Sequence, residues 1–151
     1  MQEQTLSIAL SPESLGLAVF HGQRLKQLEA YWLHAMPKAA EASAGYVLRC
    51  IDTFNPTLAL MQKQSGESSD VRAAILEALR ATSHPVIEID DKELFASYGD
   101  PPLAKKEELH QMVRALFPQI PSNRLVLSCL DAVAAGLHFE TKRLLESDAP
   151  A

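Results

Sequence analysis

The sequence predicts an α/β domain with a mixed five-stranded sheet, in which three antiparallel strands are followed by parallel strands, and with helices on both faces. Two observations predict it. Residues 6–33 consist of apolar or alternating runs separated only by short turns, which is typical of antiparallel strands. From residue 38 onwards, helical periodicity alternates with short continuous apolar runs, as in parallel strands that are covered on both faces.

The antiparallel strands are expected at residues 6–10, 15–20 and 24–33. Ser-Pro-Glu-Ser at 11–14 supplies the chemistry of a tight turn, and His-Gly-Gln at 21–23 reads as a hairpin turn. Apolar and polar residues alternate along the third run, which fits an antiparallel strand at or near an edge of the sheet.

Helices and buried strands are expected to alternate after these turns. Residues 38–54 and 70–81 place apolar side chains at helical spacing, and the apolar runs 57–61 and 86–89 follow them. Short apolar runs of this kind predict strands buried on both faces. The polar stretch 62–69, rich in Ser and Gly, is expected to be a loop.

The remaining elements are a short helix at 91–98, the clearest helix at 105–117, a short extended segment at 124–127 and a last helix at 131–145. The apolar stripe of the clearest helix comprises Leu109, Met112, Val113 and Leu116. The last helix is rich in alanine, so we expect it to lie close against the sheet.

Composition favours one globular domain, residues 1–146, with a frayed tail at 147–151. Hydrophobic residues make up 47% and charged residues 22% of the chain. No apolar run approaches the roughly 20 residues of a membrane span, and the N-terminus lacks the pattern of a signal peptide. Cys50 and Cys129 sit in apolar periodic segments, so buried free thiols are favoured over a disulfide. Together these features predict a cytoplasmic protein.

The net charge of −5 counts against nucleic acid as the main partner, because phosphate contacts require a basic face. Lys105, Lys106 and Arg114 could touch phosphate. Glu107 and Glu108 neutralise that patch, which favours a solvated helix face. The sequence has neither the His and Cys spacings of a zinc site nor a glycine-rich phosphate loop.

Three stretches carry a family resemblance. Ile-Ala-Leu-Ser-Pro at 8–12 precedes Gly-Leu-Ala-Val-Phe at 16–20, Lys-Lys-Glu-Glu-Leu opens the helix at 105–117, and Ser-Cys-Leu-Asp-Ala-Val-Ala-Ala-Gly-Leu-His spans 128–138. In order and spacing they resemble the RuvC family of Holliday-junction resolvases, which has an RNase H-like fold. The likeness covers about residues 6–145.

The resemblance implies a site of four carboxylates that holds two Mg²⁺ ions. On this chain the four positions fall at Ser11, at Met61 or Gln62, at Ser128 and at Asp131. A register slip of one residue would exchange Met61 and Gln62 between faces, so both remain open. Only Asp131 is a carboxylate. The resemblance therefore implies a degenerate catalytic site and supports no metal site.

Each of these residues also has a simpler interpretation. Ser11 suits a turn, and Met61 suits the core. Ser128 with Asp131 fits a capping box at a helix N-terminus. Glu13 could lend an oxygen to the site, but a solvated side chain is the favoured interpretation. Asp90 and Asp91 are expected to cap the helix that follows them.

Two functions follow from the resemblance. The first is a pseudo-enzyme: a RuvC-like binding or scaffolding module that is able to associate with nucleic acid, forms a homodimer, as the family does, and binds a protein partner. The alternative is an active structure-specific endonuclease that uses Mg²⁺ or Mn²⁺, with Asp131 joined by Glu13 or Asp90. A weaker third hypothesis is that the chain is half of an actin-like phosphotransferase, but the sequence lacks the phosphate loop of such a protein.

Overall fold

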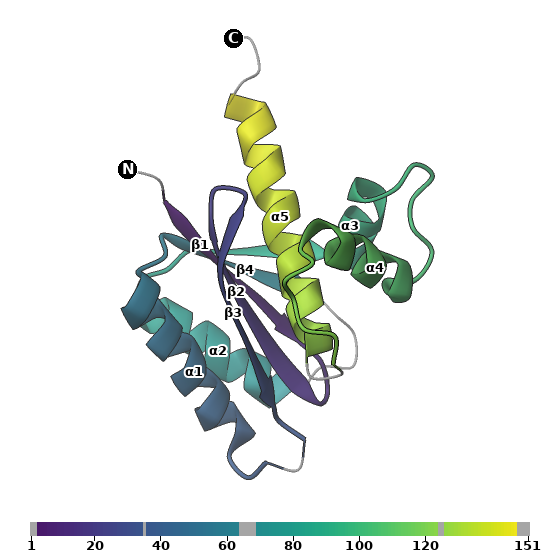
Figure 1. The fold of residues 1–151 in the computed structure, drawn as a ribbon. Helices are drawn as coiled ribbons and strands as arrows, with labels where there is room; N and C mark the ends of the chain where they lie inside the picture. Colours follow the sequence, from purple (N-terminus) through teal and green to yellow (C-terminus); the bar gives the residue numbers. More distant parts are fainter. Residues whose placement is uncertain (1–2, 35, 64–68, 124–125, 148–151) are drawn as a thin grey trace.

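The computed structural model describes residues 3–34, 36–63, 69–123 and 126–147 (Figure 1). The strands are β1 Gln4–Leu10, β2 Ser14–His21, β3 Arg24–Trp32, β4 Leu58–Lys63 and β5 Val86–Asp90. The helices are α1 Ala39–Phe54, α2 Ser69–Ala81, α3 Asp91–Ser97, α4 Lys106–Leu116 and α5 Leu127–Ser147. This order of elements confirms the predicted succession of strands and helices.

The strands form one five-stranded sheet in the order β3-β2-β1-β4-β5. The pairs β1–β2 and β2–β3 are antiparallel, whereas β1–β4 and β4–β5 are parallel. The predicted mixed sheet is confirmed, and β3 is an edge strand as its alternating sequence predicts.

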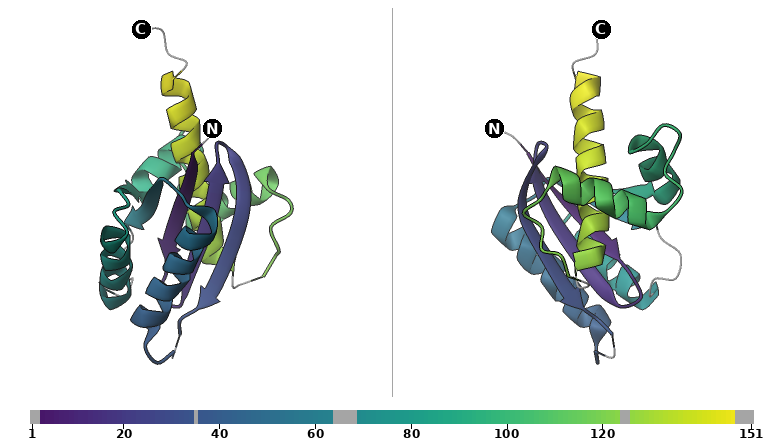
Figure 2. Two further views of the ribbon diagram at one scale, coloured as in Figure 1. Left: turned by 90° about the vertical axis from the view of Figure 1, so that its left-hand side faces the viewer. Right: turned by 45° about the vertical axis from the view of Figure 1, so that its right-hand side comes forward.

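Alternation along β1 divides the core between the two faces of the sheet. Leu6 and Ile8 pack with residues of α1 and α2 on one face. Ser7 faces α5 on the other side, where its hydroxyl donates a hydrogen bond to the carbonyl of Ala132 at 2.6 Å. Figure 2 shows α1 and α2 on one side of the sheet and α5 on the other, with α3 and α4 beside α5.

Helix α5 lies directly against the sheet because glycines remove the side chains that would separate them. A Cβ on Gly16 of β2 would lie 2.5 Å from the backbone nitrogen of Cys129 and from the backbone carbon of Ser128. A Cβ on Gly136 of α5 would overlap the ring of Phe20. The predicted close packing of the last helix therefore depends on glycine on both partners as well as on alanine.

Strand β5 corrects one prediction. The run at 86–89 was expected to be buried on both faces, but β5 ends the sheet, and of its residues only Ile89 is buried. Ile87 is 39% exposed. Continuous apolar runs do not distinguish a central strand from an edge strand, because that choice depends on which strand lies next to it.

Some element boundaries and the buried face of α4 also differ from the predictions. Gln62 and Lys63 belong to β4 instead of to the expected loop, whose residues 64–68 lie outside the described part of the chain. Helix α5 begins at Leu127, four residues before the predicted start. In α4, Leu109 and Val113 are buried, whereas Met112 and Leu116 are exposed. The predicted tail is described only as far as Ser147, where α5 ends.

Cys50 and Cys129 are both buried free thiols, as predicted. Within the described ranges, no helix is long and apolar enough to cross a membrane.

Candidate functional site

The structure brings all four family positions to one end of the sheet. Ser11 directly follows β1, Gln62 lies in β4, and Ser128 and Asp131 lie near the N-terminus of α5. Ser11, Ser128 and Asp131 line a common cavity of about 250 Å³. Gln62 points to the same place, since its Nε2 donates to the backbone carbonyl of Asp131 at 2.8 Å. Met61 faces the opposite way, into the core against α1 and α2.

Of the two residues left open by the sequence, Gln62 therefore faces this cluster, and Met61 is a core residue. The choice left open by the sequence depends on the register of β4 with β1, which pairs Ile8 with Met61. Both of these side chains lie on the side of α1 and α2, so the next residue, Gln62, projects towards α5.

The serines of the site bond to one another. The hydroxyl of Ser11 accepts from the backbone N–H of Ser14 at 3.0 Å, and the two Oγ atoms lie 2.9 Å apart. Ser14 Oγ in turn shares a hydrogen bond with Ser128 Oγ. Ser11 is thus the turn residue that its sequence context predicts. This network joins the turn after β1 to the first turn of α5.

The predicted capping box at Ser128 and Asp131 is wrong. Because α5 begins at Leu127, Ser128 already lies inside the helix, and its hydroxyl bonds to Ser14. The Asp131 carboxylate turns towards α4, where its Oδ1 lies 2.9 Å from Nε2 of His110 and 3.2 Å from Nζ of Lys106. The one family carboxylate is therefore in contact with two basic side chains.

His110 was not among the residues singled out from the sequence. It lies four positions after Lys106, so both side chains project from one face of α4. That spacing is the signal that could have paired them. Their common target is 21 residues away from His110 on another helix, and only the tertiary fold shows that they meet there.

Asp91 is a second carboxylate near this cluster. Its Oδ2 lies 3.7 Å from Lys106 Nζ, so the ammonium group lies between Asp91 and Asp131. Burial raises the pKa of the Asp91 carboxyl, although Lys106 opposes that shift. Asp91 is the first residue of α3, and the cap is supplied by Asp90, whose Oδ1 accepts from the N–H of Glu93 at 3.2 Å.

The remaining candidates lie around this centre. Glu13 lines the same cavity as Asp131. Lys105 precedes α4 and is exposed, whereas Arg114 donates to the carbonyl of Pro121 at 3.1 Å. Among the described residues, no group of three or more His, Cys, Asp or Glu side chains is placed to hold a metal ion. Serine hydroxyls and a glutamine amide are also neutral groups, and they are poorer ligands for Mg²⁺ than the charged oxygens that it prefers.

Comparisons of whole sequences identify no relative: no family model and no curated protein matches. Comparison with solved structures does find similar proteins. The chain is similar to RuvC of Thermus thermophilus with a TM-score of 0.75 and 20% identity over 93% of this chain and 96% of that one. It is also similar to the Holliday junction resolvase of fowlpox virus, with a TM-score of 0.64 and 13% identity over 93% of this chain and 99% of the viral one. The yeast mitochondrial Holliday junction resolvase matches with a TM-score of 0.65 and 12% identity over 96% of this chain and 83% of the yeast chain.

These similarities extend over nearly the whole sheet and its helices, at identities that establish the fold alone. They confirm the resemblance drawn from the order and spacing of three short stretches. The chain has the RNase H-like fold of the RuvC-like Holliday-junction resolvases.

Proposed function

We propose that this chain is a RuvC-like domain that has lost metal-dependent cleavage and acts as a binding or scaffolding module. One observation carries the proposal. Of the four positions that the resemblance assigns to carboxylates, only Asp131 has one, and that carboxylate is already in contact with Lys106 and His110.

The chemistry of two-metal cleavage explains why the loss of three carboxylates matters. Two divalent ions, about 4 Å apart, stabilise the attacking and the leaving oxygen and are themselves held by charged oxygen ligands. Ser11, Gln62 and Ser128 contribute no charge. A metal ion at Asp131 would also have to displace the ammonium group of Lys106, which lies 3.2 Å from the carboxylate oxygen.

An active divalent-metal endonuclease is the second candidate. Glu13 and Asp131 line the same cavity, so Glu13 is the carboxylate best placed to join Asp131. This candidate requires Mg²⁺ or Mn²⁺. Asp90 supports it less, because its carboxylate is engaged in capping α3.

Calorimetry with MnCl₂ and cleavage of a labelled four-way DNA junction test the proposal. We expect neither heat of binding nor cleavage from the natural sequence. A triple variant with Ser11→Asp, Gln62→Glu and Ser128→Asp restores the missing carboxylates and serves as the positive control for metal binding. Mn²⁺ binding and symmetric cutting by the natural sequence, both lost in Asp131→Asn, would establish the endonuclease instead.

Nucleic acid remains a candidate ligand without cleavage, since one of the similar structures is T. thermophilus RuvC in complex with Holliday junction substrate. Fluorescence anisotropy with the same junction at several salt concentrations tests it, because phosphate contacts weaken steeply as salt rises. With a net charge of −5, we expect weak binding that disappears at physiological salt.

A homodimer, which the resemblance also implies, is part of the proposal. Light scattering coupled to size exclusion over a range of protein concentrations tests it. A monomer mass at the highest concentration would remove the dimer from the proposal without affecting the binding role.

A further inference from the structure

Strand β5 leaves one edge of the sheet open. In its parallel ladder with β4, the N–H of Ala59 donates to the carbonyl of Pro85 at 3.0 Å, and Ala59 pairs with Val86. In such a ladder, the N–H and C=O groups of Val86 and Glu88 point away from β4. Among the described residues, no strand pairs with this side of β5, and no turn or loop backbone group bonds to Val86 or Glu88.

The opposite edge of the sheet is protected in ways that β5 is not. Along β3, Lys26 is exposed, and the pairing with β2 shifts at Val19 and Phe20. A lysine and an irregular register both discourage the addition of another strand. The register of β5 is continuous, and the apolar side chain of Ile87 is 39% exposed beside the open edge.

A cavity of about 320 Å³ lies next to β5 on the side that faces α5. Ile87, Ile89 and Phe139 supply its apolar lining, and Lys142 and Glu146 of α5 are among its polar residues. Because side chains of a strand alternate between faces, a segment added beside β5 would direct every second side chain to this side. Aliphatic residues would extend the contact of Ile87 and Ile89.

The other face of β5 is acidic. Val86, Glu88 and Asp90 alternate with the two isoleucines, and the pairing of Glu88 with Arg72 of α2 places the Glu88 carboxylate on the side away from α5. The Glu88 side chain is 48% exposed although it pairs with Arg72. A second copy paired antiparallel about Glu88 would set two Glu88 side chains opposite each other, which is unfavourable. A basic side chain opposite Glu88 would be favourable.

We propose that β5 binds an extended segment of a partner protein in which aliphatic and basic residues alternate. Such a segment adds a sixth strand, places its aliphatic side chains beside Ile87 and directs a basic side chain to Glu88. The inference rests on the proposed binding role and names its partner. Failure of the proposed function and failure of this inference can be distinguished. Metal binding tests the site at Asp131, and peptide binding tests β5.

The probe is a short capped peptide of alternating isoleucine and lysine, labelled for fluorescence anisotropy. Its binding is expected to weaken about tenfold in Glu88→Lys, since one favourable pair becomes a like-charge pair. The matched peptide of alternating isoleucine and glutamate should bind that variant better than it binds the natural sequence. Circular dichroism confirms that the variant is folded.

Two controls isolate strand addition. Methylation of alternate peptide nitrogens, on the edge that would face β5, removes the backbone donors and should abolish binding. Equal binding of the methylated peptide, or equal binding to Glu88→Lys, would overturn the proposal. So would the absence of peptide binding together with a dimer that Ile87→Lys dissociates, because that result assigns the edge to a second copy.

Discussion

Nε2 of His110 and Oδ1 of Asp131 lie 2.9 Å apart and connect α4 to α5. The Asp131 side chain is only 9% exposed, so its charge is stabilised mainly by its neighbours. Lys106 contacts the same oxygen and also reaches Asp91. At the one carboxylate that the resemblance assigns to the site, this chain places the ammonium group of Lys106.

A double-mutant cycle on His110→Ala and Asp131→Asn measures this contact. We expect a coupling free energy of about 1–2 kcal/mol, because the two side chains touch and share a partly buried environment. Urea unfolding of the natural sequence, both single variants and the double variant gives the coupling. Additive losses would show that the contact contributes nothing to stability.

Replacing Gly16 by Ala is expected to cost about 2–4 kcal/mol of unfolding free energy, because the new Cβ would collide with the backbone of α5. Gly45 is the matched control. It lies in α1, and a Cβ added there would have no atom within 4 Å, so Gly45→Ala should stabilise the protein by about 0.5–1 kcal/mol through helix propensity. Thermal unfolding of both variants compares them. Equal effects would contradict the close approach of β2 and α5.

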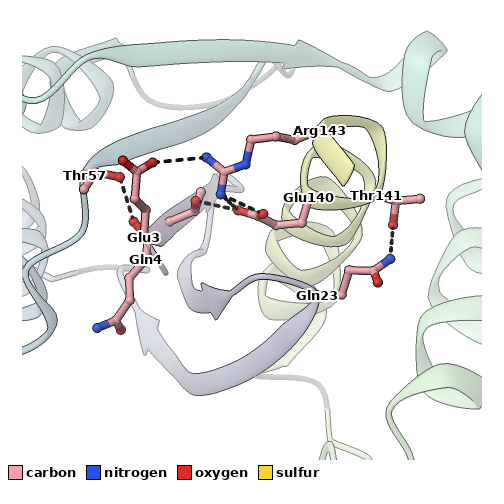
Figure 3. A network of polar contacts seen from close by, with 8 residues as sticks. Glu3, Gln4, Gln23, Thr57, Glu140, Thr141 and Arg143 are labelled. Carbon is pink, nitrogen blue, oxygen red and sulfur yellow. Dashed lines mark hydrogen bonds and ion pairs between the residues drawn. The ribbon is translucent and has the colours of Figure 1, made fainter. Parts of the chain in front are cut away.

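The buried carboxylate of Glu140 gives a third prediction (Figure 3). Its side chain is 3% exposed, accepts from the hydroxyl of Thr5 at 2.6 Å and pairs with Arg143 at 2.8 Å. Glu140→Ala would leave both donors without this acceptor, so we expect a loss of about 2–4 kcal/mol in urea unfolding.

The neighbouring Thr141 supplies the control for Glu140. Its hydroxyl accepts an exposed hydrogen bond from Gln23 at 2.9 Å, so Thr141→Ala should change stability by less than about 0.5 kcal/mol. If Thr141→Ala lowers the unfolding free energy as much as Glu140→Ala does, then burial of the Glu140 carboxylate does not explain the effect of Glu140→Ala on stability.

The two thiols predict a dependence on alkaline pH. Burial raises the pKa of Cys50 and of Cys129 from 9.0 to about 12 in the folded state. Above about pH 9 the unfolded chain loses these protons first, so the contribution of the thiols to stability should be constant below that pH and fall between pH 9 and 12. The slope is up to about 1.4 kcal/mol per pH unit for each thiol.

Unfolding in denaturant at pH 8, 9 and 10 measures that slope. A variant with Cys50→Ala and Cys129→Ala is less stable throughout and should show a smaller slope. The same slope in the variant would assign the effect to other groups, such as Tyr98, whose pKa is also raised by burial.

The sequence predicts the fold well because short turns, period-two alternation and helical stripes are local signals. Prediction from the sequence fails where the environment of a residue depends on an element that is distant in the chain but adjacent in the fold. The run at 86–89 has the composition of a buried strand, yet it lies at the edge of the sheet. Whether Gln62 or Met61 faces α5 depends on the register of β4 with β1, which the sequence does not show. Ser128 does not have its predicted capping role, because α5 begins at Leu127. His110 was missed because its partner Asp131 lies on another helix.

The glycine contacts between β2 and α5 have a consequence for how this chain could diverge. Gly16 and Gly136 fix the distance between sheet and helix by direct backbone and ring contact, and the serine hydroxyls join the turn after β1 to the helix start. These contacts are made by backbone, aromatic and hydroxyl groups of β2, α5 and the turn between β1 and β2. The backbone around Ser11, Gln62, Ser128 and Asp131 is therefore positioned by its own packing, so side chains at these positions could be exchanged one at a time while the architecture persisted.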